Sequence, residues 1–143
     1  NPAMLFVTAV AGLLDTKTGR LQFCNAGHDA PLLLGGGQPA RTLDSAGGPP
    51  LCVLEDFPYP IEEAQLNPGD LLVLFTDGVT EARGGDQVLF GADKISEYLQ
   101  GLDRNAAAEV VCTGLLREVK HFTGDEPAFD DVAIMALRWQ SAS

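Results

Sequence analysis

The most informative segment for the fold is Leu71-Leu72-Val73-Leu74-Phe75-Thr76-Asp77-Gly78. Its first five residues are all apolar and show no polar alternation, which is typical of a strand buried on both faces. Such a strand requires a covering layer on each side of its sheet. We therefore expect residues 71–75 to form the central strand of the fold, followed by a turn at Asp77-Gly78.

The chain before this strand contains several short apolar runs separated by turn signals. Residues 15–19 are polar and end in glycine, so they predict a β-hairpin between the runs on either side. Pro58 and Pro60 remove backbone donors and favour an edge strand or an irregular one. The expected strands are residues 4–14, 20–25, 31–34, 41–43 and 57–66.

The chain after the central strand is helical before it returns to a strand. Residues 93–102 carry a helical pattern, and residues 105–123 carry a stronger one. The stronger pattern has apolar residues at spacings of three and four: Ala108, Val111, Leu115, Val119 and Phe122. We expect Asn105 to cap this helix and Gly124 to end it, before a last strand at residues 132–139. This order predicts an α+β fold with antiparallel sheets.

The composition narrows the classes of protein and partner. With 143 residues and 45% hydrophobic content, residues 1–143 are expected to form a single domain. The formal net charge of −11 disfavours nucleic acid and anionic membranes as partners. No apolar run is long enough to span a membrane, and three scattered cysteines favour the reducing cytoplasm. The chain begins Asn1-Pro2-Ala3, without an initiator Met or a signal segment, so we expect a fragment of a longer protein.

Asp77 and Asp130 are the candidate metal ligands. Asp77 follows one apolar strand, and Asp130 precedes another. If these strands are antiparallel neighbours, about 4.8 Å apart, their acidic ends meet. A divalent cation would favour the joint ionisation of two such carboxylates, and oxygen ligands suit Mg²⁺, Mn²⁺ or Ca²⁺.

Other interpretations of the acidic residues remain open at this point. Asp-Gly after a strand is an ordinary turn, and Asp-Asp before a strand is an ordinary solvated loop. Asp131 should point away from the site if the strand has already begun, because successive side chains alternate faces. Zinc fits poorly because His28 and His121 lie far apart in sequence.

The order of several motifs along the chain resembles a known family. The motifs are Met4-Leu5-Phe6-Val7-Thr8, Asn25-Ala26-Gly27-His28, Pro68-Gly69-Asp70, Thr76-Asp77-Gly78-Val79-Thr80-Glu81-Ala82, Phe90-Gly91 and Asp130-Asp131. They appear in the order seen in sporulation protein E-like (stage II sporulation) phosphatases. These belong to the PPM (PP2C-like) superfamily of metal-dependent serine/threonine phosphatases, and the resemblance covers almost the whole chain.

The resemblance implies an α-β-β-α sandwich with a two-metal centre that binds Mn²⁺ or Mg²⁺. Asp77 and Asp130 match metal ligands of the family pattern. The family's bridging aspartate lies in an upstream motif outside these 143 residues, so we expect a partial sandwich that lacks its N-terminal portion. The parent protein is then an active phosphatase, and this C-terminal part of the domain is inactive or weakly active alone.

Five further residues match the family signatures near the expected ligands. They are expected to support the ligands or to order their loops: Asn25, His28, Gly78, Glu81 and Asp131. A structural role for His28 and a solvated position for Glu81 are the competing interpretations.

The resemblance also implies partners. The expected substrate is a phosphorylated protein, an anti-sigma-factor antagonist in bacterial signalling, and a sensor or receiver domain is expected upstream in the parent. An exposed sheet edge would allow self-association. The alternative is a noncatalytic interaction module or pseudophosphatase, and a weaker alternative is a calcium-binding structural domain.

Overall fold

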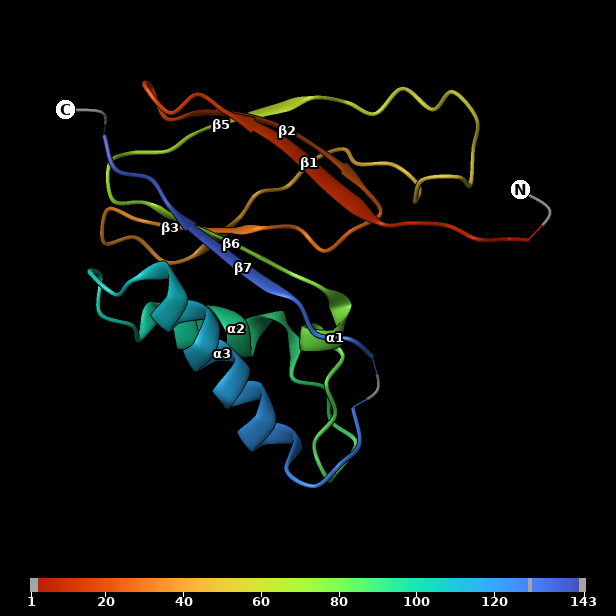
Figure 1. Ribbon diagram of the computed structural model, residues 1–143, viewed down its shortest axis with the longest axis vertical. Coiled ribbons are helices and arrows are strands. Elements are labelled where there is room, and N and C mark those ends of the chain that lie inside the picture. Colours follow the sequence, from red (N-terminus) through yellow and green to blue (C-terminus); the bar gives the residue numbers. More distant parts are fainter. Residues whose placement is uncertain (1–2, 129, 142–143) are drawn as a thin grey trace.

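Two antiparallel sheets and a layer of helices form the fold of the computed structural model, which describes residues 3–128 and 130–141 (Figure 1). The strands are β1 (Ala9–Leu14), β2 (Arg20–Ala26), β3 (Leu32–Leu34), β4 (Arg41–Thr42), β5 (Glu62–Gln65), β6 (Leu71–Phe75) and β7 (Ile134–Arg138). The helices are α1 (Asp77–Thr80), α2 (Gly91–Gln100) and α3 (Ala108–Thr123). The predicted α+β class with antiparallel sheets is confirmed.

The strands are divided between a first sheet, of order β1-β2-β5, and a second sheet, of order β4-β3-β6-β7. Every neighbouring pair is antiparallel. β6 lies between β3 and β7, with Leu72 opposite Leu33 on one side and Leu137 on the other. The apolar run therefore forms an interior strand of its sheet, as the sequence predicts.

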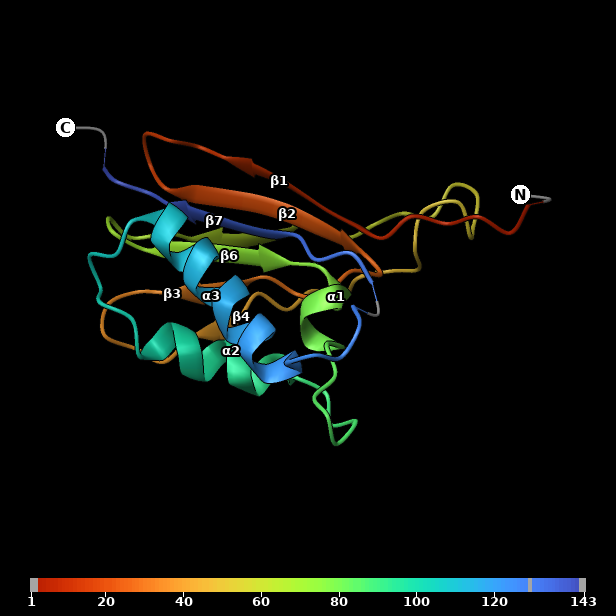
Figure 2. The ribbon, with the colours of Figure 1, turned by 60° about the horizontal axis from the view of Figure 1, so that its bottom comes forward.

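Both faces of β6 are buried, as its lack of polar alternation requires. Leu71, Val73 and Phe75 belong to a helix-side core between the second sheet and the helices. Leu72 and Leu74 point to the opposite face and join an inter-sheet core between the two sheets. α2 and α3 cover the second sheet on the side away from the first sheet (Figure 2).

α3 buries the apolar stripe that its sequence pattern predicts. Val111, Leu115 and Val119 are buried in the helix-side core. The helix ends at Gly124, whose φ of 57° is one that glycine adopts without strain. The expected start is wrong, because α3 begins at Ala108 and Ala107 takes the N-cap position. The N–H of Asn105 donates instead to Oδ1 of Asp103, 2.9 Å away, in a separate turn.

The first hairpin is shorter than expected. β1 begins at Ala9, which is paired with the last residue of β2, Ala26. Gly27 follows with a φ of 68°, and β2 ends there, so the residues before Ala9 have no partner in this sheet. Val7 instead forms an isolated bridge with Leu51. The predicted strand over residues 4–8 is therefore absent from the first sheet.

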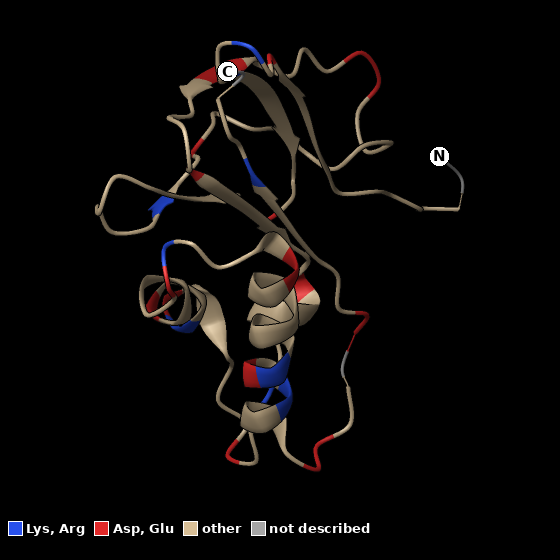
Figure 3. Ribbon diagram, turned by 60° about the vertical axis from the view of Figure 1, so that its left-hand side comes forward, with Lys and Arg blue, Asp and Glu red and all other residues tan. Residues whose placement is uncertain are grey.

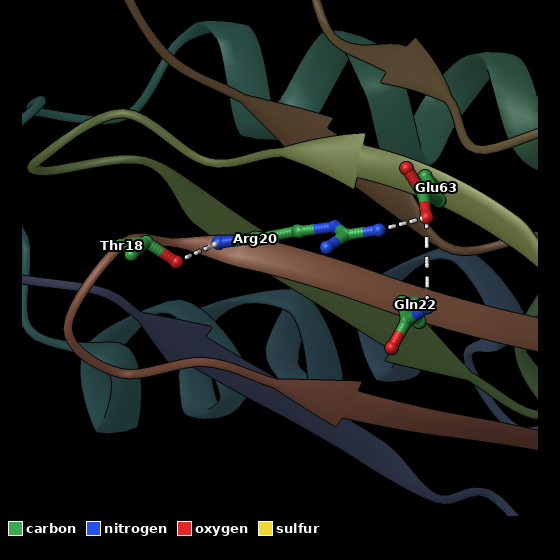
Figure 4. Close-up of polar contacts among 4 residues, drawn as sticks. All are labelled: Thr18, Arg20, Gln22 and Glu63. Atoms are coloured by element: carbon green, nitrogen blue, oxygen red, sulfur yellow. Dashed lines mark hydrogen bonds and ion pairs between the residues drawn. The ribbon is translucent and has the colours of Figure 1, made fainter.

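The first sheet has a mixed outer face. Along β2, Leu21 and Phe23 are buried in the inter-sheet core, whereas the alternating positions Arg20 and Gln22 lie on the other face. Arg20 forms an ion pair with Glu63 of β5, and Nε2 of Gln22 donates to the same carboxylate at 3.5 Å (Figure 4).

Charged residues are distributed over the surface, and acidic residues are frequent in the loops (Figure 3). The net charge of −11 is therefore not concentrated in a single element. Within the described part of the chain, no helix is long and apolar enough to cross a membrane.

Candidate functional site

The candidate site lies where β6 ends and β7 begins. These strands are antiparallel neighbours, with Phe75 opposite Ile134, so the strand arrangement that the sequence argument required is present. After Phe75 the chain passes through Thr76, in an extended conformation, into the short helix α1. Asp77 is the first residue of that helix, where we had expected only a turn.

Thr76 joins the two chain segments through its backbone and its hydroxyl. Its N–H donates to the carbonyl of Ala133 at 3.0 Å, and its Oγ1 donates to the carbonyl of Asp131 at 3.2 Å. The N–H of Ala133 donates back to Oγ1 at 3.0 Å. These three hydrogen bonds, called here the Thr76 clamp, hold the loop before β7 against the start of α1.

Gly78 brings the two segments closer than any other residue would allow. It is buried, and a Cβ at this position would lie 2.2 Å from the carbonyl oxygen of Asp131. That separation is well inside van der Waals contact, and the obstructing atom belongs to the backbone. The close approach of α1 to the Asp130-Asp131 loop therefore depends on glycine.

The two predicted ligands lie on these adjoining segments with their side chains exposed. Asp77 begins α1, and Asp130 directly precedes the clamped Asp131. Oδ1 of Asp130 accepts the N–H of Asp131 at 2.7 Å. Exposed carboxylates on adjoining segments suit a hard cation such as Mg²⁺ or Mn²⁺. Among residues 3–128 and 130–141, however, no group of three or more His, Cys, Asp or Glu side chains could hold a metal ion.

Asp131 and Glu81 are the other acidic residues of these two segments. Asp131 contributes its carbonyl to the Thr76 clamp, and its side chain is exposed. β7 begins only at Ile134, so the alternation of strand faces does not decide where the Asp131 side chain points. Glu81 is the C-cap residue of α1; its N–H donates to the carbonyl of Asp77 at 2.8 Å, and its side chain is exposed.

Asn25 and His28 shape the loop between β2 and β3. Asn25 is 8% exposed; its Nδ2 donates to the carbonyl of His28 at 2.9 Å, and its Oδ1 accepts the N–H of His28 at 2.8 Å. Nδ1 of His28 lies 2.9 Å from the carbonyl oxygen of Asp29. Both polar groups of the Asn25 side chain are thus engaged in closing this loop.

Asp29 is a residue of the site that the sequence argument missed. Its Oδ2 accepts a hydrogen bond from Oγ1 of Thr80, the last residue of α1, at 3.1 Å. This contact joins a loop after the first sheet to the helix that carries Asp77. The available sequence signal was the position of Asp29 directly after the Asn25-Ala26-Gly27-His28 motif.

A cavity of about 460 Å³ lies at the other end of β6, beside Asp70 and Leu71. Arg138 borders it and donates to the carbonyls of Gly69 and Ala106, both at 2.7 Å. Neither Asp77 nor Asp130 lines this cavity, so it is separate from the candidate site.

Comparison with known proteins identifies relatives of the whole described fold. Protein IcfG from Synechocystis sp. is 28% identical over 135 residues, which cover 93% of this chain and 20% of that protein. The structure of the RsbU and RsbW domains of Rv1364c from Mycobacterium tuberculosis matches with a TM-score of 0.79 and 28% identity. That match covers 95% of this chain and 38% of the other.

The phosphatase domain of the cell fate determinant SpoIIE from Bacillus subtilis, presoaked with Mn, shares the fold. Its TM-score is 0.74 at 18% identity, and the match covers 95% of this chain and 58% of that one. This chain thus spans less than two thirds of the length of each of these relatives. The sequence profile of stage II sporulation protein E (SpoIIE) matches residues 1–140. The chain therefore belongs to the SpoIIE family, and it shares the fold of PP2C phosphatase domains.

Proposed function

We propose that this chain takes part in metal-dependent hydrolysis of phosphoserine or phosphothreonine in a protein substrate, with Asp77 and Asp130 as metal ligands. The observation that carries the proposal is the contact between α1 and the loop before β7. The Thr76 clamp and the Gly78–Asp131 contact keep the two acidic segments side by side. Such adjacency is what two ligands of one centre require.

Mn²⁺ or Mg²⁺, when bound, supplies a water of lowered pKa for attack on phosphorus and positive charge for the phosphoryl oxygens. The residues of the chain hold and orient that centre: Asp77 and Asp130 bind, while Thr76 and Gly78 fix the distance between their segments. A chain of net charge −11 repels a phosphorylated substrate unless a cation supplies local positive charge. The charge of the protein therefore favours a metal-dependent site.

Membership of the family supports a phosphorylated protein as the substrate class. We propose an anti-sigma-factor antagonist of a cytoplasmic bacterial signalling pathway, with a sensor or receiver domain upstream in the parent protein. The described residues supply two predicted carboxylate ligands, Asp77 and Asp130, and no group of three or more side chains that could hold a metal ion. We therefore propose that residues 1–143 are the C-terminal part of one phosphatase domain and that an upstream segment completes its sandwich. The chain alone is then inactive or weakly active. Self-association through an exposed sheet edge belongs to the same proposal.

The proposal is tested with a phosphoserine peptide and added Mn²⁺, on this chain and on a longer version of its parent. The longer protein should hydrolyse the peptide, and Asp77→Asn or Asp130→Asn should lower its rate by at least about 100-fold. Loss of a residue that only supports a metal ligand already costs up to about 100-fold, so loss of the ligand itself should cost at least as much. Asp103→Asn is the matched control, because Asp103 is an exposed aspartate of the α2–α3 loop.

The outcomes separate an enzyme from an interaction module. Unchanged rates in both ligand variants would exclude the assigned roles. A longer protein that binds its partner but shows no manganese-dependent turnover would identify a pseudophosphatase.

A further inference from the structure

The hydrogen bond between Thr80 and Asp29 links two parts of the molecule that are far apart in sequence. Oγ1 of Thr80 lies 3.1 Å from Oδ2 of Asp29 and 3.3 Å from the carbonyl oxygen of Asp77. Both neighbours are acceptors, so the Thr80 hydroxyl is the donor. One hydroxyl thus connects the loop after β2 with the residue that begins α1.

Asp29 is itself held in place from the first sheet. The buried Asn25 side chain binds both the N–H and the carbonyl of His28, and His28 binds the carbonyl of Asp29. We call this series of contacts, from Asn25 through His28 and Asp29 to Thr80, the strap. It leads from the end of β2 to the end of α1.

α1 depends on such contacts for its orientation. It has four residues, and a helix of that length is unstable by itself. Thr76 provides no side-chain cap at its start. Val79 anchors its middle in the helix-side core, the Thr76 clamp holds its beginning, and the strap holds its end.

We propose that Asp29 is a positioning residue for Asp77, acting through Thr80 on the orientation of α1. The inference rests on the proposed function, since it assumes that Asp77 binds the metal. Loss of the strap frees the last residue of α1 and widens the range of positions of the Asp77 carboxylate. The metal then binds less tightly, because its ligand is no longer held in one orientation.

The test measures Mn²⁺ affinity together with amide hydrogen exchange of α1 in the absence of metal. Asp29→Ala should weaken Mn²⁺ binding on the order of tenfold and should speed amide exchange in α1. About tenfold is the lower end of the range found when a residue that supports a metal ligand is lost. Asp29→Asn retains an acceptor oxygen and should stay within about twofold of wild type. Thr80→Val should weaken binding at least as much as Asp29→Ala, because it also removes the 3.3 Å contact with the carbonyl of Asp77. Asp29→Ala should add nothing to Thr80→Val, because the hydrogen bond between the two residues is then already lost.

Asp103→Ala is the control, since Oδ1 of Asp103 also accepts a backbone N–H in a loop, that of Asn105, but in the α2–α3 connection. It should change neither readout. The proposal is overturned if Asp29→Asn binds Mn²⁺ as weakly as Asp29→Ala, because charge rather than the hydrogen bond would then be responsible. It is also overturned if exchange in α1 is unchanged in Asp29→Ala.

A wild-type chain that binds no Mn²⁺ would contradict metal ligation by this chain, which is the proposed function. Exchange in α1 would still decide whether the strap holds the helix. Faster exchange in Asp29→Ala and Thr80→Val, with Asp29→Asn unchanged, would support the strap in that case.

Discussion

The two sheets are of similar size but differ in what covers them. The second sheet is packed on both faces, by the first sheet on one side and by α2 and α3 on the other (Figures 1 and 2). The first sheet buries one face in the inter-sheet core, and its other face carries the Arg20–Glu63 ion pair and the 71% exposed Leu13.

The sequence of each strand reflects this difference. β6 has five apolar residues in succession, whereas β2 alternates, with Leu21 and Phe23 inward and Arg20 and Gln22 outward. The candidate ligands are attached to the fully packed sheet, directly after β6 and before β7. The proposed site is therefore built on the sheet that is packed on both faces, where neighbouring layers restrict movement.

The largest expected effect on stability is the difference between substitutions on the outer sides of the two sheets. Leu115→Ala removes a fully buried side chain of α3 and should lower the free energy of unfolding by about 2–5 kcal/mol. Leu13→Ala changes the outer face of the first sheet and should stay within about 0.5 kcal/mol of wild type. Urea denaturation measures both, and equal losses would show that the two outer faces are equally packed.

A smaller effect is expected where the packing of the second sheet reaches the site. Gly78→Ala places a Cβ against the carbonyl of Asp131 and should lower the free energy of unfolding by about 1–3 kcal/mol. It should also separate α1 from the Asp130-Asp131 loop and weaken Mn²⁺ binding. Gly85→Ala is the matched control, because no atom lies within 4 Å of its built Cβ. If both variants unfold at the same urea concentration, the close contact at Gly78 is refuted.

The smallest effect is expected at the ion pair of the first sheet. Arg20 and Glu63 are about half exposed, with side-chain exposures of 55% and 54%, so a double-mutant cycle with alanine should give about 0.2–1 kcal/mol. The coupling should fall further in 1 M salt, where the screening length is about 3 Å. A larger coupling that is insensitive to salt would mean that this face is covered in solution, and the contrast between the sheets would fail.

The apolar patterns account for the parts of the fold that sequence predicts well. The run of residues 71–75 predicts a doubly buried strand, and the spacing of Val111, Leu115 and Val119 predicts the buried face of α3. Both features depend on which side chains are buried. Burial depends mainly on whether a side chain is apolar, which can be read directly from the sequence. The convergence of Asp77 and Asp130 requires the last strand to pair antiparallel with the central one, and the structure shows this pairing between β6 and β7.

The features that were missed depend on individual hydrogen bonds and not on the pattern of apolar residues. α3 begins at Ala108, after a turn in which Oδ1 of Asp103 accepts the N–H of Asn105. At the site, the Asp29–Thr80 hydrogen bond joins residues 51 positions apart. Asp29 directly follows the Asn25-Ala26-Gly27-His28 motif, but its residue type does not reveal that its partner is Thr80.

β6 contributes side chains to both cores and leads directly to Asp77. Packing on both of its faces therefore limits which substitutions its sequence can accept. A larger side chain at Val73 would press on the helices, and one at Leu72 would press on the first sheet. Either displacement would be passed along a short strand to the residue proposed to bind the metal. Among homologous sequences, this strand should accordingly diverge slowly even though none of its five side chains belongs to the proposed chemistry.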